Sequence, residues 1–133
     1  HSLQRPETLS HIDPVYANFL FTGEGIRLID WEYAGMADPL IDFAMATIYA
    51  EKDFDYAFRL LDYYGDTDVP RDKAEQLVTA YMALGGFLWA LWAVYKEALG
   101  VSFGTYPLTQ SRYAKEGYRR FAEREGGADN PLN

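Results

Sequence analysis

The stretch HIDPVYANFLFTGEGIRLID, residues 11–30, decides the fold. It opens with a polar segment in which Pro14 disfavours a helix, so we expect residues 11–18 to form a loop. Two apolar runs then flank the Gly-containing turn TGEG, a pattern that predicts a β-hairpin over residues 19–31. Asp30 stands at the end of the second predicted strand. The stretch therefore predicts a small β element beside a polar loop, where we place the candidate chemistry.

Helical patterns follow this element after Gly35. Asp38 followed by Pro39 predicts a helix start, with Asp38 as the N-cap and Pro39 in the first helical position. The apolar residues on one face of this helix are Ile41, Ala44, Met45 and Ile48. The chain is thus predicted to be mainly α with a small β-hairpin.

Three further helices are expected, over residues 54–64, Arg71–Leu99 and Leu108–Arg124. Within the long helix, Gly85 and Gly86 predict a thin or bent spot. The other segments are expected to be irregular: a polar leader over residues 1–10, a turn at Asp66–Pro70, a loop at Gly100–Pro107 and a frayed tail over residues 126–133.

Composition limits the classes of function. With 133 residues, 49% of them hydrophobic and 24% charged, the chain is typical of one compact globular domain. The absence of cysteine excludes disulfides, thiolate metal sites and cysteine nucleophiles. A formal net charge of −8 makes the chain a poor partner for nucleic acid and suits it to cations.

The sequence also bears on location. We find no signal-peptide pattern at the N-terminus. The longest apolar run is bracketed by Lys73, Glu75, Lys96 and Glu97, so we expect no membrane insertion. The expectation is a soluble protein of the cytoplasm.

The candidate chemistry rests on Asp13, Asn18 and Asp30. The spacing His11-x-Asp13-x-x-x-x-Asn18 is that of a protein-kinase catalytic loop. There the aspartate accepts the proton of the attacking hydroxyl, the asparagine helps to hold magnesium, and a second aspartate after a short hairpin binds magnesium too. Hard oxygen ligands suit Mg²⁺, and phosphoryl transfer depends on charge neutralisation and alignment. His11 is expected to brace the loop.

An alternative without chemistry exists for the same residues. An isolated H-x-D is common in loops, and Asp and Asn favour turns for their own conformational reasons. The strand-like run that ends in Asp30, at the expected distance downstream, favours a functional site over this alternative.

The stretches HIDPVYANFLF and IRLIDWEYAGMADPLIDFA resemble the C-terminal lobe of the choline/ethanolamine kinase and aminoglycoside phosphotransferase superfamily, which has a protein-kinase-like fold. Within that superfamily, the resemblance is closest to bacterial choline kinases of the type that decorate lipopolysaccharide and teichoic acid. GGFLWALWAVYKEALGVSFGTYPLTQSRYAKEGYRRF also resembles the end of choline kinases. The resemblance extends from Leu9 to Phe121.

The resemblance implies a role for each matched residue. Asp13 would be the catalytic base, and Asp42 would buttress the loop. The implied magnesium ligands are Asn18 and Asp30, with Glu32 assisting. The implied walls of a box for the quaternary ammonium of choline are Trp89 and Trp92, with Tyr33 and Tyr106 as weaker candidates.

The tryptophan pair can be examined on physical grounds. Trp89 and Trp92 are three residues apart in a predicted helix, so their rings share a face. A trimethylammonium group cannot donate an N–H hydrogen bond, and aromatic faces hold it at about 0.5–2 kcal/mol per contact. From spacing alone, packing in the helical core is the favoured interpretation of both residues. The resemblance reverses that preference.

Kinases of this superfamily also have an N-terminal lobe with a phosphate-covering loop and a lysine on a strand. Only ten residues precede His11, and all four lysines follow Asp30. We therefore expect residues 1–133 to be a single C-terminal catalytic and substrate-binding lobe without the ATP-binding lobe. ATP would be the co-substrate and Mg²⁺ the cofactor of a longer parent. The isolated chain would be inactive, bind choline weakly, and self-associate through surface left uncovered.

Two other functions remain open at this point. One is a kinase for another small alcohol, such as ethanolamine, an aminoglycoside or a sugar. The other is a non-catalytic module that binds choline. The tryptophan pair argues against a polycationic aminoglycoside, which would call for several acidic loops in place of an aromatic box.

Overall fold

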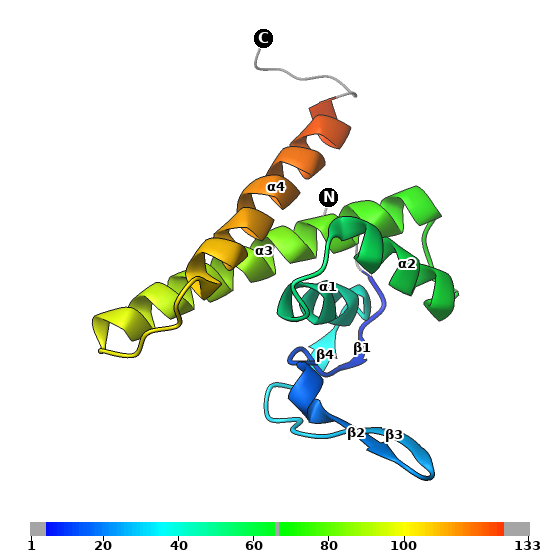
Figure 1. Ribbon diagram of the computed structural model, residues 1–133. Coiled ribbons are helices and arrows are strands. Elements are labelled where there is room, and N and C mark those ends of the chain that lie inside the picture. Colours follow the sequence, from blue (N-terminus) through cyan, green and yellow to red (C-terminus); the bar gives the residue numbers. More distant parts are fainter. Residues whose placement is uncertain (1–4, 66, 127–133) are drawn as a thin grey trace.

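The computed structural model describes residues 5–65 and 67–126, and its described part is dominated by helices (Figure 1). The strands form two separate antiparallel pairs: β1 (Thr8–Ser10) with β4 (Gly35–Ala37), and β2 (Phe19–Thr22) with β3 (Gly25–Leu28). The helices are α1 (Leu40–Tyr49), α2 (Phe54–Tyr64), α3 (Arg71–Ala98) and α4 (Tyr106–Gly126). The predicted class, mainly α with a small β-hairpin, is confirmed.

The hairpin of β2 and β3 forms where the apolar runs predicted it. Phe19 pairs with Leu28, and Thr22 pairs with Gly25 across a two-residue turn. The Thr22 hydroxyl donates to the Gly25 carbonyl at 2.9 Å and accepts from the Glu24 amide at 3.2 Å, which closes the turn. Gly25 has φ +126°, a conformation that side chains with a Cβ rarely adopt.

The pair of β1 and β4 was not predicted. Thr8–Ser10 lies in the segment expected to be a polar leader, and Gly35–Ala37 lies where the pattern had already been interpreted as helical. Each strand has only three residues and finds its partner far along the chain. Such short strands carry no readable alternation, so only the fold as a whole brings them together.

The first helix begins one residue later than predicted. α1 starts at Leu40, with Pro39 and not Asp38 in the N-cap position. The Asp38 carboxylate nevertheless accepts a hydrogen bond from the Leu40 amide at 3.0 Å, and its carbonyl accepts from the Ile41 amide. Asp38 also pairs with Arg5 at 2.8 Å and accepts from the Tyr81 hydroxyl at 2.9 Å, so it joins the N-terminal segment to α1 and α3.

The other helix boundaries lie close to the predicted ones. α2 matches its prediction and is capped by Asp53, whose carboxylate accepts from the Tyr56 amide at 2.8 Å. α3 ends one residue before Leu99, and α4 begins two residues before Leu108, which shortens the predicted loop. Residue 66 of the predicted turn, residues 1–4 of the predicted leader and residues 127–133 of the predicted frayed tail lie outside the described residues.

The core lies where α1, α2 and α4 meet the long helix α3. In Figure 1, α4 crosses α3, whereas the β2–β3 hairpin lies at the opposite side of the molecule from α4. Of the face predicted for α1, Ala44, Met45 and Ile48 are buried, and Ile41 is partly buried beside the fully buried Leu40. Burial of this apolar face is what stabilises a helix as short as α1.

Gly85 and Gly86 allow close packing, while the helix continues through both without interruption. A Cβ at Gly86 would stand 2.6 Å from the Gln110 carbonyl oxygen and 2.7 Å from Cβ of Tyr113, both in α4. A Cβ at Gly117 of α4 would stand 2.8 Å from Cβ of Ala83. The glycines therefore set how near α3 and α4 approach one another.

The composition of α3 corrects the expectation that no apolar stretch is long enough to cross a membrane. By length and composition, Arg71–Ala98 contains an 18-residue stretch apolar enough to cross a membrane. The bracketing charges that were expected to exclude such a stretch do not do so. A core helix of a water-soluble protein passes the same test, and α3 packs against α1 and α4, yet only 33% of that stretch is buried. Packing inside the described residues thus accounts for part of its apolar character.

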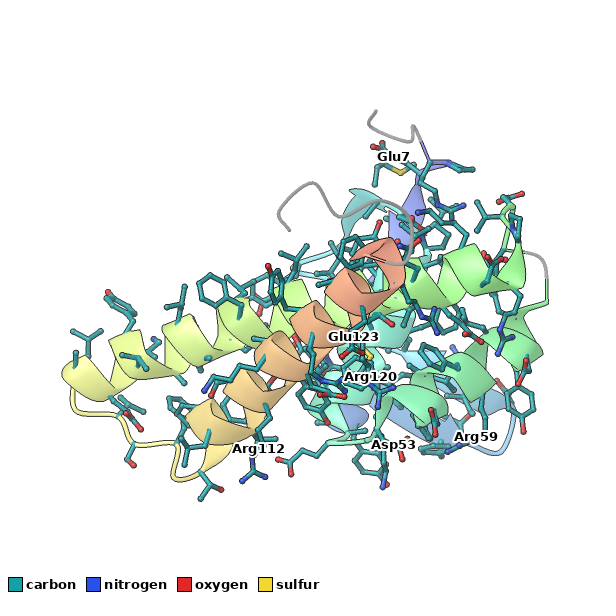
Figure 2. All side chains as sticks on the ribbon, turned by 90° about the horizontal axis from the view of Figure 1, so that it is seen from above. Glu7, Asp53, Arg59, Arg112, Arg120 and Glu123 are labelled. Atoms are coloured by element: carbon teal, nitrogen blue, oxygen red, sulfur yellow. The ribbon has the colours of Figure 1, made fainter. Side chains whose placement is uncertain are left out.

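Charged side chains fasten α4 to α2 (Figure 2). The guanidinium of Arg120 lies 4.6 Å from the ring centroid of Phe54, and that of Arg124 lies 5.9 Å from the ring of Phe58. Figure 2 shows Arg112, Arg120 and Glu123 on the side of α4 where Asp53 lies. This surface carries both signs of charge.

The close approach at Gly86 predicts a large cost for adding one methyl group there. Gly86→Ala should lower the free energy of unfolding by about 1–3 kcal/mol, because the new Cβ meets backbone atoms that cannot turn aside. Gly85→Ala is the matched control, since its Cβ meets the ends of the Ile48 and Met45 side chains and should cost less. Urea denaturation measures both, and equal stability of the two variants would contradict the packing role of Gly86.

Candidate active site

The loop over residues 11–18 is held in place by Asp42, in the first turn of α1. One carboxylate oxygen accepts from the His11 amide at 2.8 Å, and the other accepts from the Ile12 amide at 2.7 Å. Ile12 has φ +69°, a strained conformation for a β-branched residue. Charge-assisted bonds to two successive amides are what keep this turn of the backbone in place.

His11 is buried beneath the loop. Its Nε2 lies 2.8 Å from the carbonyl oxygen of Ile29, and its ring meets the Trp31 ring edge-on with centroids 4.8 Å apart. The indole nitrogen of Trp31 in turn donates to the Leu28 carbonyl at 2.9 Å. His11 thus connects the loop to the end of β3 and has no place in the hollow described below.

Asp13 and Asn18 lie against one another at the two ends of this loop. The Asn18 side-chain amide donates to the Asp13 carbonyl at 2.9 Å and is 3.5 Å from its carboxylate. Asn18 is buried, and its own carbonyl accepts from the Ile29 amide at 2.9 Å. Asp30, the next residue, is therefore held near Asn18 by the backbone, and it adopts φ +62°, which aspartate tolerates.

The predicted magnesium ligands offer oxygen donors but no finished cage. Among the described residues, no three acidic or histidine side chains come together as a metal site. The Asn18 nitrogen is used on Asp13, which leaves its amide oxygen for a cation, and the Asp30 carboxylate is exposed. Hard oxygens in small number, completed by water and phosphate, are the set that Mg²⁺ takes. The donors present fit that ion.

An open hollow of about 770 Å³ lies beside Asp13. It is lined by residues from four parts of the chain: the loop, the segment after β3, α1, and the region from the second half of α3 to the start of α4. Its lining residues are Ile12, Asp13, Val15, Glu32, Tyr33, Met45, Tyr49, Leu88, Trp89, Trp92, Phe103 and Tyr106. The predicted base and all four predicted box residues thus share one hollow with Glu32, while Asp30 lies outside its wall.

The aromatic wall of the hollow is continuous. Trp89 and Trp92 meet at nearly a right angle, with centroids 5.5 Å apart. Tyr49 lies 5.7 Å from Trp89 on one side, and Phe103 lies 4.9 Å from Trp92 on the other. Lys96 places its ammonium 5.5 Å from the Trp92 centroid, so this ring already faces one cation. Trp89 also packs against the hydrophobic core, so this residue is in part a core residue and in part a wall of the hollow.

Two lining aromatics were missed from the sequence. Tyr49 ends α1, one turn beyond Met45, and was not among the residues predicted for the apolar face of that helix. Phe103 lies in the loop before α4 and carried one weak signal, an aromatic side chain in a Gly- and Ser-rich stretch. The structure also sets their neighbour Tyr106 near acidic groups: burial, with the charges of Asp13 and Glu51, raises the pKa of Tyr106 to about 12.

Comparison with known proteins decides the family. A model of the phosphotransferase enzyme family (APH) matches residues 1–75, more than half of the chain. The chain belongs to this phosphotransferase family. The matched stretch contains the loop, the hairpin and Asp42, whereas Trp89 and Trp92 lie beyond it.

The individual proteins that the chain matches form a narrower group within this family. The chain is 35% identical to the protein LicA of Haemophilus influenzae over 103 residues, which cover 74% of this chain and 39% of LicA. The crystal structure of choline kinase LicA from Streptococcus pneumoniae matches with 32% identity and a TM-score of 0.69, over 86% of this chain and 40% of that one. A LicA structure in complex with AMP matches over the same shares, with 32% identity and a TM-score of 0.71.

These matches confirm the predicted resemblance to choline kinases and to their superfamily. They also confirm the predicted protein-kinase-like class of fold. The chain spans about two fifths of the length of the relatives it matches.

The bonds to Asp42 predict a specific sensitivity. Asp42→Asn should lower the free energy of unfolding by about 1–3 kcal/mol, because an amide NH₂ would face a backbone N–H that now has a carboxylate acceptor. Asp55→Asn is the control, since Asp55 occupies the first turn of α2 as Asp42 does that of α1. Chemical denaturation checks the difference. Equal losses in the two variants would mean that the helix dipole, and not the loop, accounts for the role of Asp42.

Proposed function

We propose that this chain is the catalytic and substrate-binding lobe of an ATP- and Mg²⁺-dependent kinase that transfers the γ-phosphoryl group to the hydroxyl of choline. The observation that carries the proposal is the hollow in which Asp13 lies among aromatic side chains from α1, α3 and α4. A base beside an aromatic box matches a substrate that is a quaternary cation at one end and an alcohol at the other.

At the alcohol end, Asp13 is the base. Its carboxylate lies in the wall of the hollow and accepts the proton of the substrate hydroxyl as that oxygen attacks phosphorus. The bond from Asn18 and the grip of Asp42 on the preceding residues hold Asp13 in one orientation. His11 supports the loop from beneath. Alignment of this kind supplies much of the catalysis in phosphoryl transfer.

Near the phosphates, Asn18 and Asp30 would hold Mg²⁺, and Glu32 would assist from the wall of the hollow. The ion would neutralise charge on the phosphoryl oxygens. Asp30 and Asn18 are joined by the bond between the Ile29 amide and the Asn18 carbonyl, so the two ligands belong to one rigid unit.

At the cation end, the rings of Trp89, Trp92, Tyr33 and Tyr106 form the box, to which Tyr49 and Phe103 add further wall. Each ring face contributes about 0.5–2 kcal/mol to holding a trimethylammonium group, the larger values where water is excluded. Glu32 and Asp13 add the negative charge. Ethanolamine, whose ammonium donates N–H bonds, gains less from such walls than choline.

In this proposal, the lobe that binds ATP belongs to a longer parent protein. Relatives about twice as long as this chain supply ample sequence for a lobe that grips ATP, and a LicA relative has been solved with AMP. The chain alone would form the single C-terminal lobe, bind choline weakly and transfer no phosphoryl group at parent-like rates. The parent would act in the cytoplasm on a small amino alcohol, without nucleic acid as a partner.

Choline binding tests the box separately from the chemistry. Trp92→Ala should weaken choline binding about three- to thirtyfold, the loss of one cation–π wall. Asp13→Asn in the full-length parent should abolish most of the transfer yet leave choline affinity within about threefold, because a single charge beside the solvent-open hollow adds little to affinity. Titration by tryptophan fluorescence and a phosphocholine assay separate the two effects.

Two results would contradict the assignments. Unchanged choline affinity in both Trp89→Ala and Trp92→Ala would remove the box. Full activity of Asp13→Asn would remove the base. If the parent phosphorylated ethanolamine in preference to choline, the proposed substrate would be wrong and a different small alcohol would take its place.

The surface of α3 supports the proposed self-association. Large apolar side chains, each more than half exposed, recur at helical spacing along its second half: Leu84, Phe87, Leu88, Leu91, Val94 and Tyr95. An apolar stripe of this size is unusual on a monomer.

We expect the chain to self-associate as its concentration rises, and Leu91→Glu to shift it toward monomer. Burying a charged side chain in an apolar contact between two chains costs more free energy than the contact provides. Tyr63→Glu adds the same charge at an exposed aromatic residue of α2 and should leave association unchanged. Light scattering over a concentration series measures this, and a monomer at every concentration would contradict the proposal.

A further inference from the structure

Two buried polar atoms in the wall of the hollow have no hydrogen-bond partner. They are the hydroxyl oxygen of Tyr49 and the indole nitrogen of Trp89, both fully shielded from solvent among the described residues. A buried donor or acceptor without a partner is costly, and native proteins keep few of them. Two such atoms side by side therefore call for an explanation.

The two atoms come from different helices and meet at the hollow. Tyr49 is the last residue of α1, and Trp89 lies in the second half of α3, with ring centroids 5.7 Å apart. Asp13 lines the same hollow from the loop. The Tyr49 hydroxyl interacts with both Trp89 and Asp13, so it stands between a wall of the cation box and the carboxylate proposed as the base.

Hydrogen bonds among Trp89, Tyr49 and Asp13 can run in one direction only, from the indole through the hydroxyl to the carboxylate. The indole N–H can only donate, and an ionised carboxylate can only accept. A tyrosine hydroxyl does both, provided that it keeps its proton. Burial raises the pKa of Tyr49 far above its usual value, and the Asp13 carboxylate adds to this both as a hydrogen-bond acceptor within reach and as a negative charge, while the Trp89 N–H opposes it. The hydroxyl therefore stays protonated at neutral pH, and both neighbours lie close to it although neither bond is well aligned in the free protein.

We infer that Tyr49 is a positioning residue: in the substrate complex its hydroxyl accepts from the Trp89 N–H and donates to the Asp13 carboxylate. This inference rests on the proposed function. A carboxylate has room for about four hydrogen bonds, so bonds from Tyr49 and Asn18 leave space for the substrate hydroxyl. The base is then oriented from both sides, by Asn18 within its own loop and by Tyr49 from α1.

The arrangement links the two ends of the substrate site. A cation against the ring of Trp89 fixes that ring, and the fixed ring places its N–H toward Tyr49. The Tyr49 hydroxyl in turn fixes the carboxylate that receives the proton. A cation bound in the box thus helps to align Asp13 through Trp89 and Tyr49. The cation itself need not touch the Asp13 carboxylate.

Tyr49→Phe in the full-length parent tests the inference, because it removes the hydroxyl and keeps the aromatic wall. The kcat for phosphoryl transfer should fall about ten- to a hundredfold, the loss of one charge-assisted hydrogen bond, while KM for choline changes less than about threefold. The melting temperature should stay the same or rise, because the variant removes a buried hydroxyl that makes no well-aligned hydrogen bond in the free protein.

Tyr113→Phe is the matched control and should behave in the opposite way. Its buried hydroxyl donates to the Lys52 carbonyl at 2.7 Å and lies outside the hollow. Its loss should lower the melting temperature by about 3–6 °C and leave kcat unchanged.

An unchanged kcat in Tyr49→Phe, with wild-type transfer to choline intact, overturns the inference alone. A lowered melting temperature with a kcat that falls only in proportion to folded protein also overturns it, since that pattern marks a structural residue. A wild-type parent that transfers no phosphoryl group to any small alcohol overturns the proposed function, and this inference with it.

Discussion

The structure around the candidate site depends on one carboxylate. Asp42 accepts hydrogen bonds from two successive backbone amides, those of His11 and Ile12, and so fastens an irregular loop to the start of a helix. Ile12 stands at positive φ, which a β-branched residue does not adopt unaided. The same turn of backbone delivers Asp13 to the hollow and, through Asn18 and Ile29, sets the end of the hairpin. Loop, hairpin and helix are one unit because of this anchor.

The other half of the site depends on how closely two helices can approach. A Cβ at Gly86 of α3 would clash with Gln110 and Tyr113 of α4, and a Cβ at Gly117 of α4 would clash with Ala83 of α3. These contacts fix the crossing of α3 and α4 and thereby the place where Tyr106, at the start of α4, meets Trp89 and Trp92. The anchor at Asp42 and the crossing at Gly86 are independent constraints, and the hollow forms where the elements they position come together.

How much of this the sequence could predict depends on the distance over which each feature is encoded. α2 and α3 were predicted nearly to the residue, and the hairpin was predicted at the right place although it ends at Leu28 and not at residue 31, because turn residues and apolar periodicity encode these elements locally. The pairing of β1 with β4 was not, because three-residue strands far apart carry no local pattern. Tyr49 was missed for a related reason: its place in the wall arises from α1 meeting α3, which no spacing within α1 reveals. The grouping of Asp13 with Trp89 came from a family resemblance, and spacing alone favoured the core for that tryptophan.

Several features that weaken this fold lie around the hollow and along α3, although two further buried atoms without a partner, His11 Nδ1 and Gln110 Oε1, belong to residues outside the wall of the hollow. Two buried polar atoms, in Tyr49 and Trp89, lack partners, and Ile12 is strained. A chain selected for stability alone would replace such groups, since each change would be neutral or favourable in the free protein. Their presence at one site, on the same wall as Asp13, is more simply explained by the contacts they make once that site is filled. The exposed apolar stripe of α3 is explained in the same way, because apolar surface of that kind is retained where another surface covers it.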